Sequence, residues 1–199
     1  MRHALLLLAA TLALGGCAMQ QASPSGEEKQ LQTRLEGDEQ KSFLRDYARL
    51  LSESGNHAEA ARILEELRRE DPANLAITRQ IADVYERAGQ LELALLAWEG
   101  IYRGKKGDPL QDGAEFARVA LLNRRYGLAR EVYHDWLAAA GENSSLRITA
   151  MNNLGYSYLL ERDMSNARHW FERALAIDPL HGRARANLEL LRRLQAEER

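Results

Sequence analysis

The sequence repeats a pattern about every 34 residues, and this periodicity constrains the fold more than any other feature. The clearest copy, residues 148–181, has Leu154, Gly155 and Tyr158 in its first half and Ala167, Phe171 and Ala174 in its second. Apolar residues recur at spacings of three and four, which predicts helices. A unit of this length holds two helices, and one such pair cannot bury its apolar faces alone. The chain must therefore stack several units.

Three further copies precede this one and begin at about residues 41, 75 and 110. Gly55 and Gly89 stand where a first helix should end, and prolines close or follow the units at positions 72, 109 and 179. The third copy is the most divergent, with extra residues through Gly141–Ser144.

These residues resemble the tetratricopeptide repeat (TPR), with Leu, Gly and Tyr in the first helix, Ala, an aromatic residue and Ala in the second, and then Pro. The resemblance implies an all-α fold, a right-handed superhelix of antiparallel helix pairs, with repeats at about 41–74, 75–108, 110–147 and 148–181. A last amphipathic helix, 183–195, should cap the final repeat, because repeat arrays need a polar outer face at their ends. The repeat domain is then 40–199.

The first sixteen residues form a separate element. A short basic start precedes an uncharged apolar run from Ala4 to Leu14, which is too short to span a membrane and is typical of a signal peptide. The run ends in Leu14-Gly15-Gly16-Cys17, which contains the single cysteine of the chain. This segment resembles a bacterial lipobox and implies that Cys17 carries the lipid. The alternative is an ordinary cleaved signal peptide.

Residues 17–39 follow as the lipidated cysteine and a flexible tether, because polar residues, Pro24 and Gly26 dominate the segment. Ala18 stands where many lipoproteins retained at the inner membrane have Asp. By that resemblance, we expect the protein to be anchored in the outer membrane and to face the periplasm.

Composition and motifs argue against several classes of function. A formal net charge of −2 does not suit a nucleic-acid binder, which should carry a basic excess. His57, His134, His169 and His181 share no metal-ligand spacing, and neither a phosphate loop nor a nucleophile elbow is present. We therefore expect no catalytic residue, metal, cofactor or small-molecule substrate, and no enzyme. An enzyme with an unrecognised site is the competing class.

In the repeat family, the first helix of each pair lines a concave groove that binds a protein or peptide. The resemblance assigns seven residues to such a partner-binding groove: Arg45, Arg49, Arg79, Asp83, Arg118, Asn152 and Tyr156. Arginines in the first half would suit acidic groups of a partner, and the second half would suit an apolar anchor. The alternative is that these charges form a solvated face.

A short lipoprotein of this kind resembles the repeat lipoproteins of tight-adherence (Flp) pilus assembly and the pilotins of type IV pili. The resemblance implies an assembly factor for a pilus or secretion system, which contacts the membrane through its lipid anchor. An adaptor for outer-membrane barrel assembly or for peptidoglycan enzymes is the alternative, because one fold serves many partners.

Overall fold

The computed structural model describes residues 26–197, with side chains from residue 37 onward. The expected signal peptide and Cys17 lie outside the described residues. The chain divides into two compact units, residues 1–39 and 40–199. The described part contains only helices, namely α1 (Gly26–Glu53), α2 (His57–Glu70), α3 (Leu75–Arg87), α4 (Leu91–Gly104), α5 (Gln111–Leu122), α6 (Tyr126–Ala139), α7 (Ser144–Leu160), α8 (Met164–Ile177) and α9 (Gly182–Glu197).

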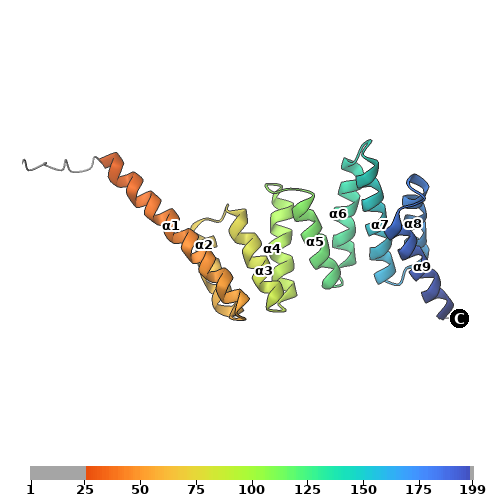
Figure 1. The fold of residues 1–199 in the computed structure, drawn as a ribbon, viewed down its shortest axis with the longest axis horizontal. Helices are drawn as coiled ribbons and strands as arrows, with labels where there is room; N and C mark the ends of the chain where they lie inside the picture. The colour runs from red at the N-terminus through yellow and green to blue at the C-terminus, as the bar shows by residue number, and fades with distance from the viewer. Residues whose placement is uncertain (1–25, 198–199) are drawn as a thin grey trace, which may run out of the picture. The chain divides into compact units, whose positions relative to one another are not determined.

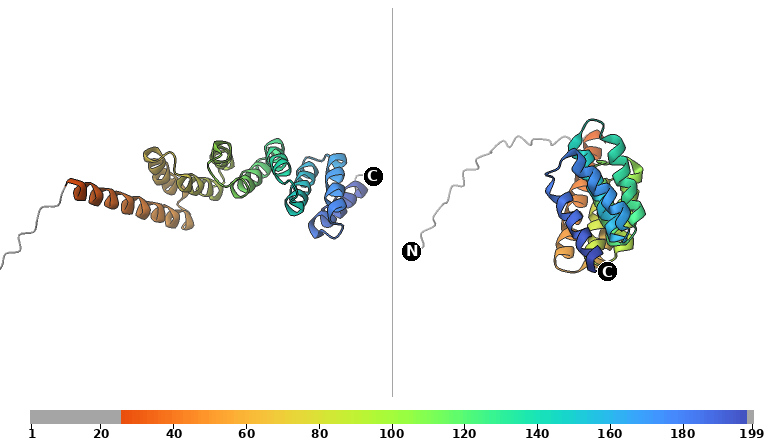
Figure 2. Two further views of the ribbon diagram at one scale, coloured as in Figure 1. Left: turned by 90° about the horizontal axis from the view of Figure 1, so that it is seen from above. Right: turned by 90° about the vertical axis from the view of Figure 1, so that its right-hand side faces the viewer.

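Within residues 40–199, each helix packs against its neighbour in the chain, as Figures 1 and 2 show. The apolar core runs along the stack as a series of clusters. One cluster joins Ala48 of α1 to α2 and α3, and a larger one joins α3 through α7 around Phe116 and Leu154. The last cluster joins α7, α8 and α9 around Phe171 and Leu191. Sequential packing of this kind is the architecture of a repeat protein.

Short turns separate the helices and use residues that suit them. Gly55 and Gly89 have φ angles of +87° and +71°, in the left-handed region that glycine adopts without steric cost. The side chain of Asn74 accepts hydrogen bonds from the N–H groups of Ala76 and Ile77 at the start of α3. Asp163 caps α8 in the same way.

Gly155 lies where the two helices of the last repeat approach most closely. A Cβ atom on this residue would lie 2.5 Å from Cε1 of Phe171 in α8 and 3.1 Å from the carbonyl oxygen of Ala167. Real Cβ atoms do not come this close to a ring, so only glycine fits without a shift. The repeat register that places a small residue here therefore follows from helix packing.

Two segments differ from the sequence expectation. Residues 26–39, which we assigned to the flexible tether, are helical and form the start of α1. After Gly26 this segment is rich in Glu, Lys, Gln and Leu and lacks proline, so its intrinsic propensity favours helix. Helix α7 begins at Ser144 rather than near residue 148, because Asn143 caps it and accepts the N–H of Leu146.

Helix α9 caps the stack. Ala184, Leu188 and Leu191 are buried, and Leu188 and Leu191 pack with Phe171 of α8. Most other residues of α9 are exposed, and many are charged. The helix thus covers the apolar side of the last repeat and presents a polar surface outward.

Candidate partner-binding groove

The seven predicted groove residues lie on the first helices of the four repeats, which are α1, α3, α5 and α7. Three of them, Arg49, Arg79 and Asp83, line one hollow of about 270 Å³ between α1 and α3. Arg49 forms an ion pair with Glu53, and Asp83 forms one with Arg87, each within its own helix. Arg49 and Asp83 therefore each belong to an exposed pair of opposite sign. Such pairs contribute little to stability.

Arg45 and Arg79 connect neighbouring first helices. Nε of Arg45 donates to Oε1 of Gln80 at 2.9 Å. Nε and Nη2 of Arg79 donate to the two carboxylate oxygens of Asp112, each at 2.8 Å. Both side chains thus cross from one repeat to the next, and each donates to an acceptor within the fold.

Asp112 is the most deeply buried charged residue among the described residues, with 2% of its surface exposed. Besides Arg79, its carboxylate accepts the backbone N–H of Asp108 at 2.8 Å. The hydrogen bonds from Arg79 to Asp112 raise the pKa of the Arg79 guanidinium above its ordinary value. A buried carboxylate with a bidentate guanidinium partner must stay paired, because loss of one partner would leave a buried charge. Arg79 is therefore a structural link as well as a groove residue.

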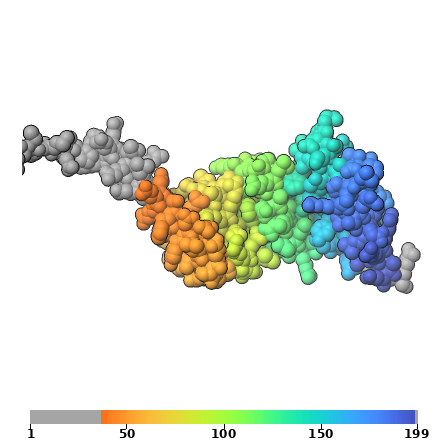
Figure 3. All heavy atoms as spheres, viewed as in Figure 1, coloured from red at the N-terminus to blue at the C-terminus, as the bar shows by residue number. Residues whose placement is uncertain are grey.

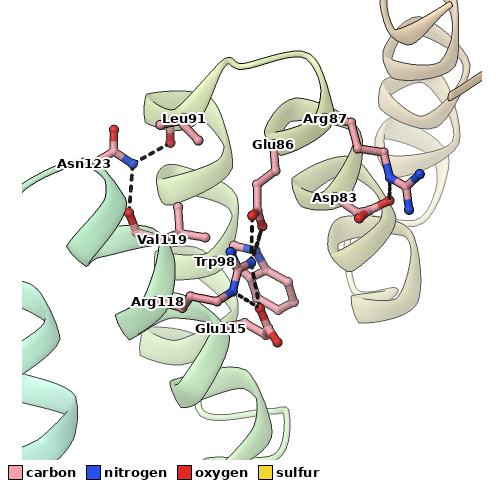
Figure 4. Close-up of polar contacts among 9 residues, drawn as sticks. All are labelled: Asp83, Glu86, Arg87, Leu91, Trp98, Glu115, Arg118, Val119 and Asn123. Carbon is pink, nitrogen blue, oxygen red and sulfur yellow. Dashed lines mark hydrogen bonds and ion pairs between the residues drawn. The ribbon is translucent and has the colours of Figure 1, made fainter. Parts of the chain in front are cut away.

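Arg118 lies at the centre of a polar cluster between α3 and α5 (Figure 4). It donates to both carboxylate oxygens of Glu86, at 2.8 and 2.7 Å, and to Glu115 at 2.8 Å. Glu86 also accepts the indole N–H of Trp98 at 3.1 Å. One guanidinium therefore serves two carboxylates, and a partner's acid would have to compete with both.

Asn152 is nearly buried, with 6% of its surface exposed. The side-chain oxygen Oδ1 of Asn152 accepts a hydrogen bond from the side-chain nitrogen Nδ2 of Asn187 in α9 at 3.0 Å. This contact joins the last repeat to the capping helix. The structure thus places Asn152 at an internal junction rather than on the open face of the groove.

Tyr156 lies on the exposed side of α7 and belongs to an apolar surface. Leu160 follows it one helical turn later and is also exposed, and Leu122 is exposed at the equivalent end of α5 in the preceding repeat. Behind Tyr156, burial raises the pKa of Tyr133 to about 12, with a smaller contribution from Tyr156 itself. The second half of the groove therefore carries apolar side chains where Glu53 and Arg87 stand in the first half.

Sequence reasoning missed the role of Asp112 and the links between repeats. Several links join residues of complementary charge that are about one repeat apart in sequence: Arg79–Asp112, Glu86–Arg118, Glu92–Arg125 and Arg130–Glu161. Opposite charges at the repeat spacing are a signal that the sequence contains. The pattern of a single helix does not contain this signal, because the two charges of each link lie on helices of different repeats.

A larger cleft, of about 1130 Å³, lies among the second helices α4 and α6 and the loop between α4 and α5. Two hydrogen bonds join polar groups of its wall. The hydroxyl of Tyr102 donates to Asp135 at 2.6 Å, and the indole N–H of Trp136 donates to the carbonyl oxygen of Pro109 at 3.2 Å. The Tyr102 hydroxyl and the Trp136 indole thus bond within the fold, and we place the candidate site in the groove, where the predicted residues lie.

Among residues 26–197 no cluster of His, Cys, Asp or Glu has the arrangement of a metal site. Within the same range, none of the helices combines the length and the apolar character that crossing a membrane requires.

Two tetratricopeptide-repeat family models match the chain, over residues 51–97 and 115–181, and together they cover more than half of it. The chain belongs to the tetratricopeptide-repeat family. This agrees with the helix pairs described above and confirms the predicted all-α TPR solenoid. No curated protein sequence matches this TPR chain.

Solved structures resemble the TPR chain in fold. A MamA protein from Desulfovibrio magneticus RS-1 is 18% identical, with 78% of this chain and 85% of that chain covered and a TM-score of 0.58. A tetratricopeptide repeat protein from Parabacteroides merdae ATCC 43184 is 19% identical, with 79% of this chain and 60% of that chain covered and a TM-score of 0.59. Another MamA structure is 16% identical, with 77% and 81% covered and a TM-score of 0.59. At these identities the likeness is one of fold.

Proposed function

We propose that the protein is a scaffold that holds a peptide segment of a partner protein in the groove of its first helices. The observation that carries this proposal is the exposed apolar surface of Leu122, Tyr156 and Leu160. Leu122 and Leu160 hold equivalent positions of neighbouring repeats, and Tyr156 precedes Leu160 by one helical turn, so we infer that the three residues face the same groove. An aromatic anchor that loses water on binding supplies much of the affinity of such an interface, and apolar neighbours exclude water around it.

The charged half of the groove contributes selectivity rather than affinity. Arg49 and Asp83 are already paired with Glu53 and Arg87, and Arg118 is held by two carboxylates. A charged group of the partner must replace one member of such a pair, so it gains little net binding free energy. A partner with the wrong charge at that place is repelled. The fitting ligand is therefore an extended or helical segment with apolar side chains at one end and mixed charge at the other.

A binding measurement tests the groove. After a partner is identified by pull-down, Tyr156→Ala should weaken binding by about 2 kcal/mol, roughly 30-fold. Arg49→Ala should change it by less than about 0.5 kcal/mol. The matched control is Arg62→Ala, because Arg62 is likewise an exposed arginine paired within its own helix, but on the second helix α2. Equal losses from Tyr156→Ala and Arg62→Ala would place the binding site elsewhere.

We further propose that the protein is a lipoprotein of the outer membrane, anchored through Cys17 and facing the periplasm. The lipobox-like segment before Cys17 and the apolar run before it support this proposal. An anchor of more than one acyl chain holds a protein stably on a membrane. Cys17→Ser should move the protein from the membrane fraction to the soluble or unprocessed fraction. Unchanged partitioning would exclude lipid attachment at this residue.

The assembly task is the most specific part of the proposal. We infer that the groove serves a pilus or secretion system as an assembly factor or pilotin-like adaptor, on the resemblance of a short TPR lipoprotein to such factors. Deletion of the gene should then reduce the amount of assembled secretin or pilus. Normal pili, together with defective barrel assembly or altered peptidoglycan, would favour the alternative adaptor function instead.

A further inference from the structure

In each repeat after the first, the first helix packs against the second helix of the repeat before it. Counted from the start of each repeat, the residues that do so fall at positions 3, 7 and 10. In α3 these are Ile77, Ile81 and Val84, which share a buried cluster with Ile63, Leu64 and Leu67 of α2. The same positions are buried in the later helices of this type. They are Asp112, Phe116 and Val119 in α5, Ala150, Leu154 and Ser157 in α7 and, counted from Gly182, Ala184, Leu188 and Leu191 in the capping helix α9.

Helix α1 carries apolar side chains at the same three positions, but here they are exposed. Phe43, Tyr47 and Leu50 expose 68%, 44% and 54% of their surface. The rings of Phe43 and Tyr47 lie parallel, with centroids 6.3 Å apart and an interplanar angle of 5°. Within residues 40–199, α1 has the stacking surface of a first helix without a second helix in front of it. We name these three residues the α1 stripe.

The opposite end of the stack, α9, is polar where it would meet a further helix. In α7, Gly155 at position 8 lies against Phe171 of α8, which is the second helix of the same repeat. The corresponding face of α9 carries Arg185, Glu189 and Arg192. Helix α9 therefore follows the rule that a terminal repeat presents a polar outer face, and α1 departs from it. In Figure 3 the two ends are the orange and the dark blue atoms.

We propose that the α1 stripe is an interface with a second copy of this chain, in which two α1 helices lie antiparallel across a two-fold axis near Tyr47. A two-fold contact uses the same patch on both copies, so a single apolar stripe is sufficient. The charged face of α9 is a poor partner for Phe43 and Leu50. End-to-end stacking of copies is therefore disfavoured, and a closed dimer results.

The charges beside the stripe are compatible with this arrangement. Asp46 and Arg49 lie on one flank of α1, 3.7 Å apart at their closest charged atoms. In an antiparallel pair related by a two-fold axis, the same flank of both helices meets along one edge. Each Asp46 then lies on the edge that carries Arg49 of the other copy. Three side chains per copy form a small contact, so the dimer should be weak and dependent on concentration.

Light scattering during size-exclusion chromatography tests the proposal on the chain carrying Cys17→Ser, which removes the lipid site. The measured mass should rise toward that of a dimer as the concentration increases through the micromolar range. Phe43→Glu and Tyr47→Glu should hold the protein at the monomer mass. Leu96→Glu is the matched control, because Leu96 is as exposed as Phe43 but lies on α4. It should behave as the parent.

Disulfide trapping tests the geometry. Since Cys17 is the single cysteine of the sequence, Tyr47→Cys in the Cys17→Ser background carries one thiol, close to the proposed axis. It should form a disulfide dimer under mild oxidation much faster than Leu96→Cys. A monomer at all concentrations, a dimer that Phe43→Glu leaves intact, or an open-ended series of larger assemblies would each overturn the proposal. None of these variants alters Tyr156, so the groove proposal is tested separately.

Discussion

The two ends of the repeat array carry the same helix type with opposite surfaces. Helix α9 buries positions 3, 7 and 10 against α8 and faces outward with Arg185, Glu189 and Arg192. Helix α1 buries Ala48 against α2, and it exposes Phe43 and Tyr47 where α9 has buried residues. The difference does not come from the backbone, because both are regular first helices. Within residues 40–197 it comes from which neighbouring helix is absent, and from whether the face left exposed is charged or apolar.

A first helix of a repeat array makes two different contacts. Each first helix has one face for the second helix of its own pair and another for the repeat before it. At the C-terminal end the face left over is charged, which keeps it soluble. At the N-terminal end the face left over is apolar, and exposed apolar patches on soluble proteins commonly mark interaction sites.

The largest expected difference in stability is between substitutions at the same position of α3 and of α1. Ile77→Ala removes a fully buried side chain and should lower the free energy of unfolding by about 2–5 kcal/mol. Phe43→Ala changes a mostly exposed stacking position and should cost less than about 0.5 kcal/mol. Chemical denaturation at low protein concentration, where the chain is monomeric, measures both. Similar losses from the two variants would mean that the face of α1 is covered.

Position 8 also has different surroundings in α7 and in α9. Gly155→Leu should lower the free energy of unfolding by about 1–3 kcal/mol or more, which is the usual cost of overpacking a core. The new side chain must displace Phe171. Glu189→Leu lies at the same position of α9, with which no second helix pairs within residues 40–197, and it should be nearly neutral. Thermal unfolding midpoints report both. If Gly155→Leu melts with the wild type, the assigned repeat register is incorrect.

The smallest effect on stability should come from the charged face of α9. Arg185→Leu with Arg192→Leu should change the free energy of unfolding by less than about 0.5 kcal/mol, because both residues are exposed. The double variant should nevertheless associate into species larger than a dimer, since it removes the charges that keep this end apart from other copies. Sedimentation velocity would detect such species. Their absence would show that charge at α9 does not control association.

Much of the fold could be predicted from the sequence, because repeated small residues and turn glycines report local packing directly. Gly155 and Gly89 are examples, since each meets a steric requirement that few other residues meet. The environment of Arg79 could not be predicted in the same way. Whether its guanidinium faces a partner or the buried Asp112 depends on the offset between adjacent repeats, which the pattern of a single repeat does not contain.

The candidate groove was predictable in outline for the same reason. Its helix and its exposed side follow from the repeat register, so Tyr156 and Arg49 were placed on an open surface. The position of Asn152 could not be predicted in this way. Its side chain bonds to Asn187 of the capping helix, which lies outside the repeat pattern. The start of α1 at Gly26 also escaped prediction, since the polar composition of a tether and that of an exposed helix overlap.

Amide hydrogen exchange at two protein concentrations tests most directly whether α1 is an open stacking surface. In the Cys17→Ser chain, protection of the α1 amides within residues 40–53 should increase when the concentration is raised, and protection of the α9 amides should stay constant. Phe43→Glu should abolish the increase without changing α3. Equal protection of α1 at both concentrations, or an increase confined to α9, would contradict the asymmetry between the two ends.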